Sequence, residues 1–177
     1  MNKLVKNLIF VLDNEKKHSD LLQKHLVQKG FEVHTYANSN DLFSHLNRQL
    51  PEIIFLDYHI SQNEFKKGTD VLISLKEKFP KIEVVMYAGD DNLEVATDTI
   101  KHGAYDYIIK GRTSVHKAEI IAENIREKNN HVREMLKYRL ATFLLIGALG
   151  LFTIITFGLW KAGVFTDYDV HGEDFMK

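Results

Sequence analysis

Cysteine is absent from the chain, and proline nearly so, with Pro51 and Pro80 the only two among 177 residues. Without cysteine, disulfides, thiolate metal sites and thiol redox switches are excluded. A strong charge of one sign is also missing, because 23 lysine and arginine side chains stand against 24 aspartate and glutamate side chains. Nucleic-acid-binding proteins usually carry a basic patch, so no nucleic-acid partner is expected.

Charged side chains are missing altogether from one long stretch, 140–160, LATFLLIGALGLFTIITFGLW. As a helix it would be about 31 Å long, close to the thickness of the hydrocarbon core of a bilayer. A buried core helix is the alternative, but such a helix usually has a polar face, and only three threonines interrupt this apolar surface. The stretch is therefore predicted to be one transmembrane helix.

The residues that flank this stretch predict its orientation. One basic residue, Lys161, follows it closely, whereas five precede it: Arg126, Lys128, Arg133, Lys137 and Arg139. Basic flanks stay on the cytoplasmic side of a membrane. We therefore expect a single-pass protein of the cell membrane, with residues 1–139 in the cytoplasm and a short polar tail, 161–177, on the other side.

Short apolar runs alternate with helix-like stretches in the rest of the chain. The predicted strands are 8–12, 31–36, 52–57, 82–88 and 105–110. This alternation is typical of an α/β fold with a doubly wound, five-stranded parallel sheet. The first helix is predicted over 19–29, with Leu21, Leu22, Leu26 and Val27 on its buried side. The last begins near Ser114 and, without glycine or proline over 127–139, should continue into the transmembrane stretch.

Polar residues follow three of the predicted strands at their carboxyl ends, where ligands bind in sheets of this kind. Asp13-Asn14 follows the first strand, Asp57 ends the third, and Lys110 ends the fifth. Carboxylates that lie close together favour a hard divalent cation, and Mg²⁺ is the cofactor we expect. With that charge neutralised, one carboxylate could attack a phosphoryl group, and Asp57 is the best candidate for the nucleophile.

Three motifs carry a resemblance to a known family: LIFVLDNE, IIFLDYHI and IKHGAYDYIIKG. In order and spacing they resemble the receiver domains of two-component response regulators, over residues 5 to about 127. The resemblance implies the flavodoxin-like, CheY-like sheet with strand order 2-1-3-4-5.

The same resemblance implies a role for each site residue. Asp57 would be the phosphoacceptor, and Lys110 would contact the phosphate. Asp13, Asp57 and the backbone carbonyl of His59 would hold the metal, and Tyr107 would be the aromatic switch residue.

Of four departures from the family pattern, two concern residues of the predicted site. Asn14 stands where a second acid usually helps to hold the metal, which would weaken Mg²⁺ binding. Tyr87 stands near the end of the fourth strand, where a serine or threonine normally takes part in the switch. Its hydroxyl lies too far from the backbone to make the same hydrogen bond.

These observations predict a membrane-anchored, stand-alone response regulator in phosphorelay signalling. Asp57 would accept a phosphoryl group from a histidine kinase or phosphotransfer protein, with no enzymatic activity beyond its own phosphorylation and dephosphorylation. The alternative is a degenerate receiver that works by phosphorylation-independent contacts at the membrane. Either form could be a homodimer. The predicted parts are a receiver domain (1–127), a juxtamembrane helical linker (128–139), the transmembrane helix (140–160) and the tail (161–177).

Overall fold

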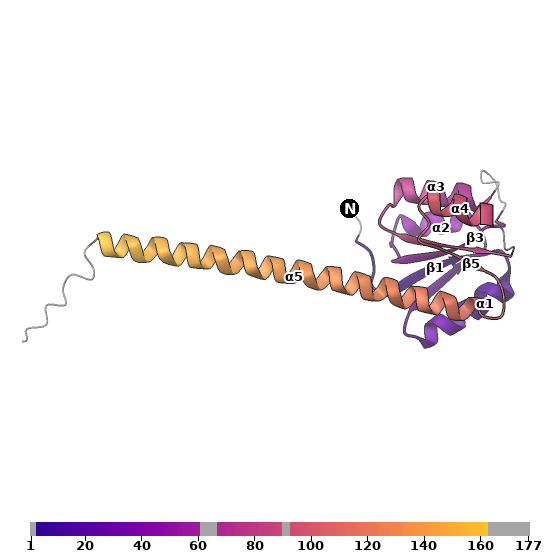
Figure 1. Cartoon of the computed structure of the whole chain (residues 1–177), viewed down its shortest axis with the longest axis horizontal. Coiled ribbons are helices and arrows are strands. Elements are labelled where there is room, and N and C mark those ends of the chain that lie inside the picture. The colour runs from indigo at the N-terminus through magenta and orange to yellow at the C-terminus, as the bar shows by residue number, and fades with distance from the viewer. Residues whose placement is uncertain (1–2, 61–66, 90–92, 163–177) are drawn as a thin grey trace, which may run out of the picture. The chain divides into compact units, whose positions relative to one another are not determined.

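The computed structural model describes residues 3–60, 67–89 and 93–162, in which strands and helices alternate along the chain (Figure 1). The strands are β1 (Leu8–Leu12), β2 (Glu32–Tyr36), β3 (Ile53–Asp57), β4 (Glu83–Ala88) and β5 (Asp106–Ile109). The helices are α1 (Lys16–Gln28), α2 (Ser39–Leu46), α3 (Gly68–Lys78), α4 (Leu93–Lys101) and α5 (Ser114–Lys161).

The strands form one parallel sheet in the order β2-β1-β3-β4-β5, which confirms the predicted fold. Every residue of β1 and β3 is buried, because helices cover both faces of the sheet. Apolar side chains such as Phe10 and Phe55 therefore point alternately into one of two cores.

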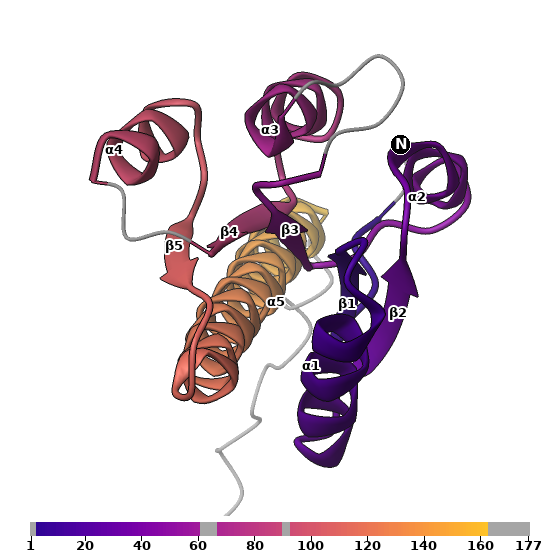
Figure 2. The ribbon, with the colours of Figure 1, turned by 90° about the vertical axis from the view of Figure 1, so that its right-hand side faces the viewer.

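The two cores lie on opposite faces of the sheet (Figure 2). One contains Leu22 and Leu26 of α1 together with buried residues of the first turns of α5. The other contains Leu42 of α2 and Leu72 and Leu75 of α3. Helix α4 lies on this second face and packs against β5 at the end of the sheet.

The start and the buried side of α1 differ from the prediction. The helix begins at Lys16, three residues earlier than expected, and Glu15 occupies its N-cap without a side-chain hydrogen bond. Ser19 is buried inside the helix, whereas Leu21 and Val27 are 56% and 50% exposed. Because of the earlier start, residues 16–18 lie in the first turn of the helix and not in a loop before it.

A buried carboxylate, Glu52, connects three parts of the fold just before β3. It is only 2% exposed. Its Oε2 accepts a hydrogen bond from the backbone N–H of Asn7 at 2.7 Å, and its Oε1 accepts one from the side chain of Asn129 at 3.0 Å. These bonds compensate the carboxylate for lost hydration and connect the N-terminal segment, β3 and α5.

Helix α5 runs without interruption from Ser114 to Lys161, as the sequence predicts. The chain divides into two compact units, Met1–Asn129 and Asn130–Lys177. In the first unit, α5 buries Ala118, Ala122 and Ile125 in the core. In the second, its apolar side chains are exposed, and the helix is long and apolar enough to cross a membrane. The predicted polar tail lies outside the described residues from position 163 onward.

Candidate functional site

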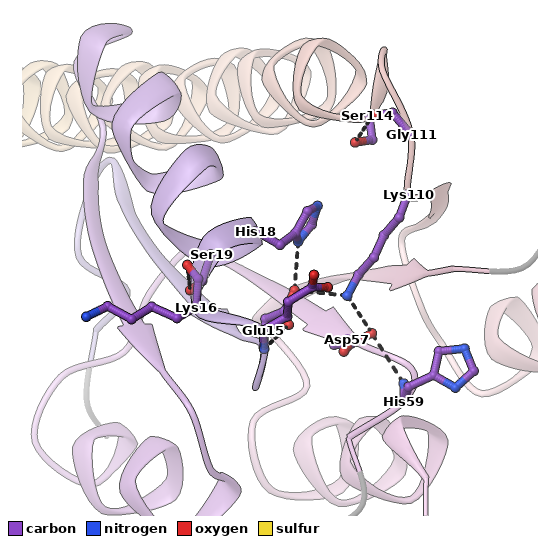
Figure 3. Close-up of polar contacts among 10 residues, drawn as sticks. Glu15, Lys16, His18, Ser19, Asp57, His59, Lys110, Gly111 and Ser114 are labelled. Atoms are coloured by element: carbon purple, nitrogen blue, oxygen red, sulfur yellow. Dashed lines mark hydrogen bonds and ion pairs between the residues drawn. The ribbon is translucent and has the colours of Figure 1, made fainter.

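Three of the residues predicted to form the site meet at the carboxyl edge of the sheet (Figure 3). The Nζ atom of Lys110, which follows β5, lies 3.0 Å from Oδ2 of Asp13 and 3.1 Å from Oδ1 of Asp57. Both carboxylate side chains are only 3% exposed. Two buried carboxylates therefore share one ammonium group, which offsets the cost of keeping negative charge away from water.

Asp13 is held by three donors. Its Oδ1 accepts the backbone N–H of Glu15 at 2.8 Å, and its Oδ2 lies 2.7 Å from Nδ1 of His18 as well as near Lys110. Burial by itself would raise the pKa of Asp13, but the hydrogen bonds from His18, Glu15 and Lys110 together outweigh it and lower that pKa. The group is thus a carboxylate at neutral pH, and because a carboxylate only accepts, His18 donates from Nδ1.

The backbone around Asp57 is fixed by neighbouring segments. Its Oδ1 accepts the backbone N–H of His59 at 3.3 Å, and the N–H of Tyr58 donates to the carbonyl of Tyr87 at 2.7 Å. Gly68, the first residue of α3, packs so closely that an added Cβ would lie 2.4 Å from the Asp57 carbonyl oxygen. The absence of a side chain at Gly68 therefore allows α3 to begin against the end of β3.

The donor set suits a hard divalent cation. Among the residues that the structure describes, no three histidine, aspartate or glutamate side chains gather as a metal site. A cation here would be held by the carboxylates of Asp13 and Asp57, the carbonyl of His59, the exposed Asn14 and water. Mg²⁺ commonly binds in this way, through one or two carboxylates and several waters. The residues therefore fit the predicted Mg²⁺, with one acid fewer than usual.

The two predicted switch residues, Tyr87 and Tyr107, are not brought together. Tyr87 is 2% exposed and lies in the core beneath α1 and α5, where its ring contacts those of His18 and Phe55. Tyr107 packs on the opposite face and lines a groove of roughly 520 Å³ between α4 and β5.

The residue of β4 that faces the same way as Tyr107 is Ala88. Side chains alternate along a strand, and Ala88, the last residue of β4, pairs in register with Ile109, which lines the groove with Tyr107. The strand therefore ends on that face in a methyl group. The expected departure from the family pattern is present, but it lies at Ala88, and Tyr87 belongs to the other core.

His18 is the site residue that sequence reasoning missed. It lies in the first turn of α1, with its side chain 15% exposed and its ring centroid 4.8 Å from that of Tyr87. The predicted start of the helix at Ser19 left His18 in a loop, with no reason to face Asp13. A predicted helix start at Lys16 would have placed His18 in the first turn of α1, close to Asp13.

The chain matches the family model of the response regulator receiver domain over residues 9–124. This match covers about two thirds of the sequence, and the sheet order and site geometry agree with it. The chain belongs to the response regulator receiver domain family.

Relatives include the nitrogen assimilation regulatory protein NtrX of Azorhizobium caulinodans, which is 32% identical over 102 residues, 58% of this chain and 22% of that protein. A putative NtrX-like response regulator of Rickettsia typhi is 31% identical over the same length. The chain spans about a fifth of the length of these curated relatives. Among solved structures, the receiver domain of NtrX from Brucella abortus is 30% identical, covers 67% of this chain and 98% of that one, and has a TM-score of 0.63.

Proposed function

We propose that this protein is a membrane-anchored response regulator that accepts a phosphoryl group on Asp57 from a histidine kinase or phosphotransfer protein. The observation that carries the proposal is the buried Asp57 carboxylate with the Lys110 ammonium 3.1 Å from its Oδ1. A nucleophile and a cation that can neutralise a transferring phosphoryl group are thus already adjacent.

In the proposed reaction, a carboxylate oxygen of Asp57 attacks the phosphorus of a phosphohistidine. An acyl phosphate O–P bond forms, the P–N bond breaks, and the imidazole leaves with the electron pair. Lys110 stabilises the negative charge on the transferring oxygens, while Asp13 and the N–H of His59 hold the ammonium and the nucleophile in place. Mg²⁺, when bound by Asp13, Asn14, Asp57 and the His59 carbonyl, would supply further positive charge at the same oxygens.

The experiment is labelling of the full chain in detergent with phosphoramidate and Mg²⁺, followed by intact mass. We expect a gain of one phosphoryl group in the wild-type chain and in Asp98→Asn, a control at an exposed aspartate of α4. Asp57→Ala should gain nothing, and omission of Mg²⁺ should suppress labelling. No gain in the wild-type chain, under conditions that label another receiver domain, would reject the proposal.

The second candidate is a receiver that works without phosphorylation, and Ala88 is the observation that favours it. A methyl group cannot donate a hydrogen bond to a phosphoryl oxygen. The hydroxyl that usually links the phosphate to the aromatic switch residue, here Tyr107, is therefore missing. The same labelling experiment separates the two functions. A chain that binds its partner equally well as wild type and as Asp57→Ala would support this second function.

Membrane anchoring is the other part of the proposal. It is supported by the uncharged residues 140–160 and by exposed apolar side chains of α5 such as Leu145 and Ile154. We expect the chain to remain in membrane pellets after an alkaline wash. Leu149→Arg, near the middle of the stretch, should weaken insertion by about 2.5–3.5 kcal/mol, whereas Lys137→Arg should not. Recovery of the wild-type chain in the soluble fraction would contradict anchoring.

A further inference from the structure

His18 lies between Asp13 and Tyr87, although it is not among the residues predicted to form the site. Its Nδ1 lies 2.7 Å from Oδ2 of Asp13 (Figure 3). Its ring packs on the ring of Tyr87, at 4.8 Å between centroids and 57° between planes. The Nε2 atom is buried without a hydrogen-bond partner. Tyr87 thus supports the face of the imidazole, and the edge that carries Nδ1 is directed at Asp13.

The contacts of Asp13 leave little of its carboxylate available. A carboxylate has about four lone-pair positions. Lys110 and His18 both reach Oδ2, and the Glu15 N–H occupies one position on Oδ1. What remains for a cation is a single position on Oδ1, so the rotation of this carboxylate determines whether that position faces the site.

The neighbouring residue increases the importance of this rotation. Asn14, the residue after Asp13, is exposed and carries no charge. Of these two residues after β1, Asp13 alone can offer a carboxylate to the cation. A site with fewer acidic ligands depends more on the orientation of each one. Groups that hydrogen-bond to a metal ligand and orient it typically change metal affinity 10–100-fold when they are removed.

We propose that His18 is a positioning residue that holds the Asp13 carboxylate in the orientation required for Mg²⁺ binding, with the Tyr87 ring holding the imidazole. The inference rests on the proposed function, because it concerns the cation of the same phosphoryl-accepting site. It assigns a role to a residue pair, His18 and Tyr87, that the reaction itself does not use.

The test is calorimetric titration of Mg²⁺ into the full chain in detergent. His18→Leu keeps an apolar contact with Tyr87 but removes the donor, and we expect it to weaken Mg²⁺ binding about 10-fold. His18→Asn carries a side-chain N–H₂ close to the place of Nδ1 and should restore affinity to within about threefold of wild type. His102→Leu, at an exposed histidine after α4, is the matched control and should be unchanged.

A second readout separates positioning from a purely structural role. In phosphoramidate labelling, His18→Leu should need about 10-fold more Mg²⁺ for half-maximal rate, yet reach the wild-type rate at saturating Mg²⁺. A lower rate at saturating Mg²⁺ with unchanged Mg²⁺ dependence would overturn the inference, as would unchanged or tighter Mg²⁺ binding in His18→Leu.

Failure of the inference is distinguishable from failure of the proposed function. If the wild-type chain binds Mg²⁺ and gains a phosphoryl group while His18→Leu behaves identically, the inference alone is wrong. If the wild-type chain neither binds Mg²⁺ nor gains a phosphoryl group, the proposed function is wrong, and the role of His18 falls with it.

Discussion

The side chains of Tyr87 and Tyr107 lie on opposite faces of the sheet, although they belong to neighbouring paired strands. Tyr107 pairs in register with Met86, and Tyr87 with Ile108. An effect of Asp57 phosphorylation on Tyr107 would therefore have to pass along the face of Ala88, and an effect on Tyr87 along the face of His18. These are two separate paths with different side chains.

The first prediction concerns the Tyr107 path. Because Ala88 has no hydroxyl, phosphorylation should change the NMR signals of the Tyr107 ring only weakly in the wild-type chain. Ala88→Ser adds a donor on that face and should enlarge the change. Tyr87→Phe, which removes a hydroxyl from the other face, should leave it unaltered. A large change in the wild-type chain that Ala88→Ser does not increase would show that Tyr107 responds without a hydroxyl at this position.

The second prediction concerns the shared ammonium. Lys110→Met leaves Asp13 and Asp57, both nearly fully buried, without the cation that lies within 3.1 Å of each. The free energy of unfolding, measured with urea at pH 7 without Mg²⁺, should fall by about 3 kcal/mol. Lys101→Met, at an exposed lysine of α4, should change it by less than about 0.5 kcal/mol. Equal stabilities for the two variants would mean that the carboxylates do not depend on Lys110.

The third prediction concerns the start of α3. A Cβ on Gly68 would lie 2.4 Å from the carbonyl oxygen of Asp57 and 2.8 Å from the Cα of Tyr58, and backbone atoms cannot easily move aside. Gly68→Ala should therefore lower the free energy of unfolding by about 1–3 kcal/mol and slow phosphoryl labelling. In Gly111→Ala the new Cβ meets nothing within 4 Å, so this variant should resemble wild type. An unaffected Gly68→Ala would contradict the close packing.

The fourth prediction concerns acid stability. Hydrogen bonds from Lys29, the residue after α1, at 2.6 Å and from His25 of α1 at 2.7 Å lower the pKa of Glu119 on α5 from 4.5 to about 2. Because the folded pKa lies below the unfolded one, the stabilisation is complete above pH 4.5 and is lost as the pH falls toward 2. Glu119→Gln lacks this dependence. Urea titrations from pH 6 to pH 3 should show a smaller loss of stability for Glu119→Gln than for the wild-type chain, and parallel losses would contradict the role of this contact.

Strands β1, β3 and β4 were predictable from the sequence because burial on both faces produces nearly continuous apolar runs. The predicted strand 8–12 has the bounds of β1, and the other four agree to within one residue at either end. Asp13, Asp57 and Lys110 were predictable as a group for a related reason, since parallel strands place their carboxyl ends at one edge.

The features that the sequence did not predict have local physical causes. The start of α1 carries no side-chain cap at Glu15, and Ser19, the predicted first residue of the helix, donates its hydroxyl to the Lys16 carbonyl inside the helix. The sequence also did not show toward which face of the sheet the Tyr87 side chain points. Five of its six residues are buried, so no alternation of polar and apolar side chains shows which of them face each core.

Glu52 also determines where this chain can be divided. Its carboxylate is buried and takes donors from Asn7 near one end of the first unit and from Asn129 at the other. A fragment that stops short of Asn129 would leave the buried carboxylate without the hydrogen bond from that side chain, at a cost of about 1–3 kcal/mol. The shortest fragment that keeps this connection runs from before Asn7 through Asn129, and this sets the limits for separating the receiver domain from the long apolar helix.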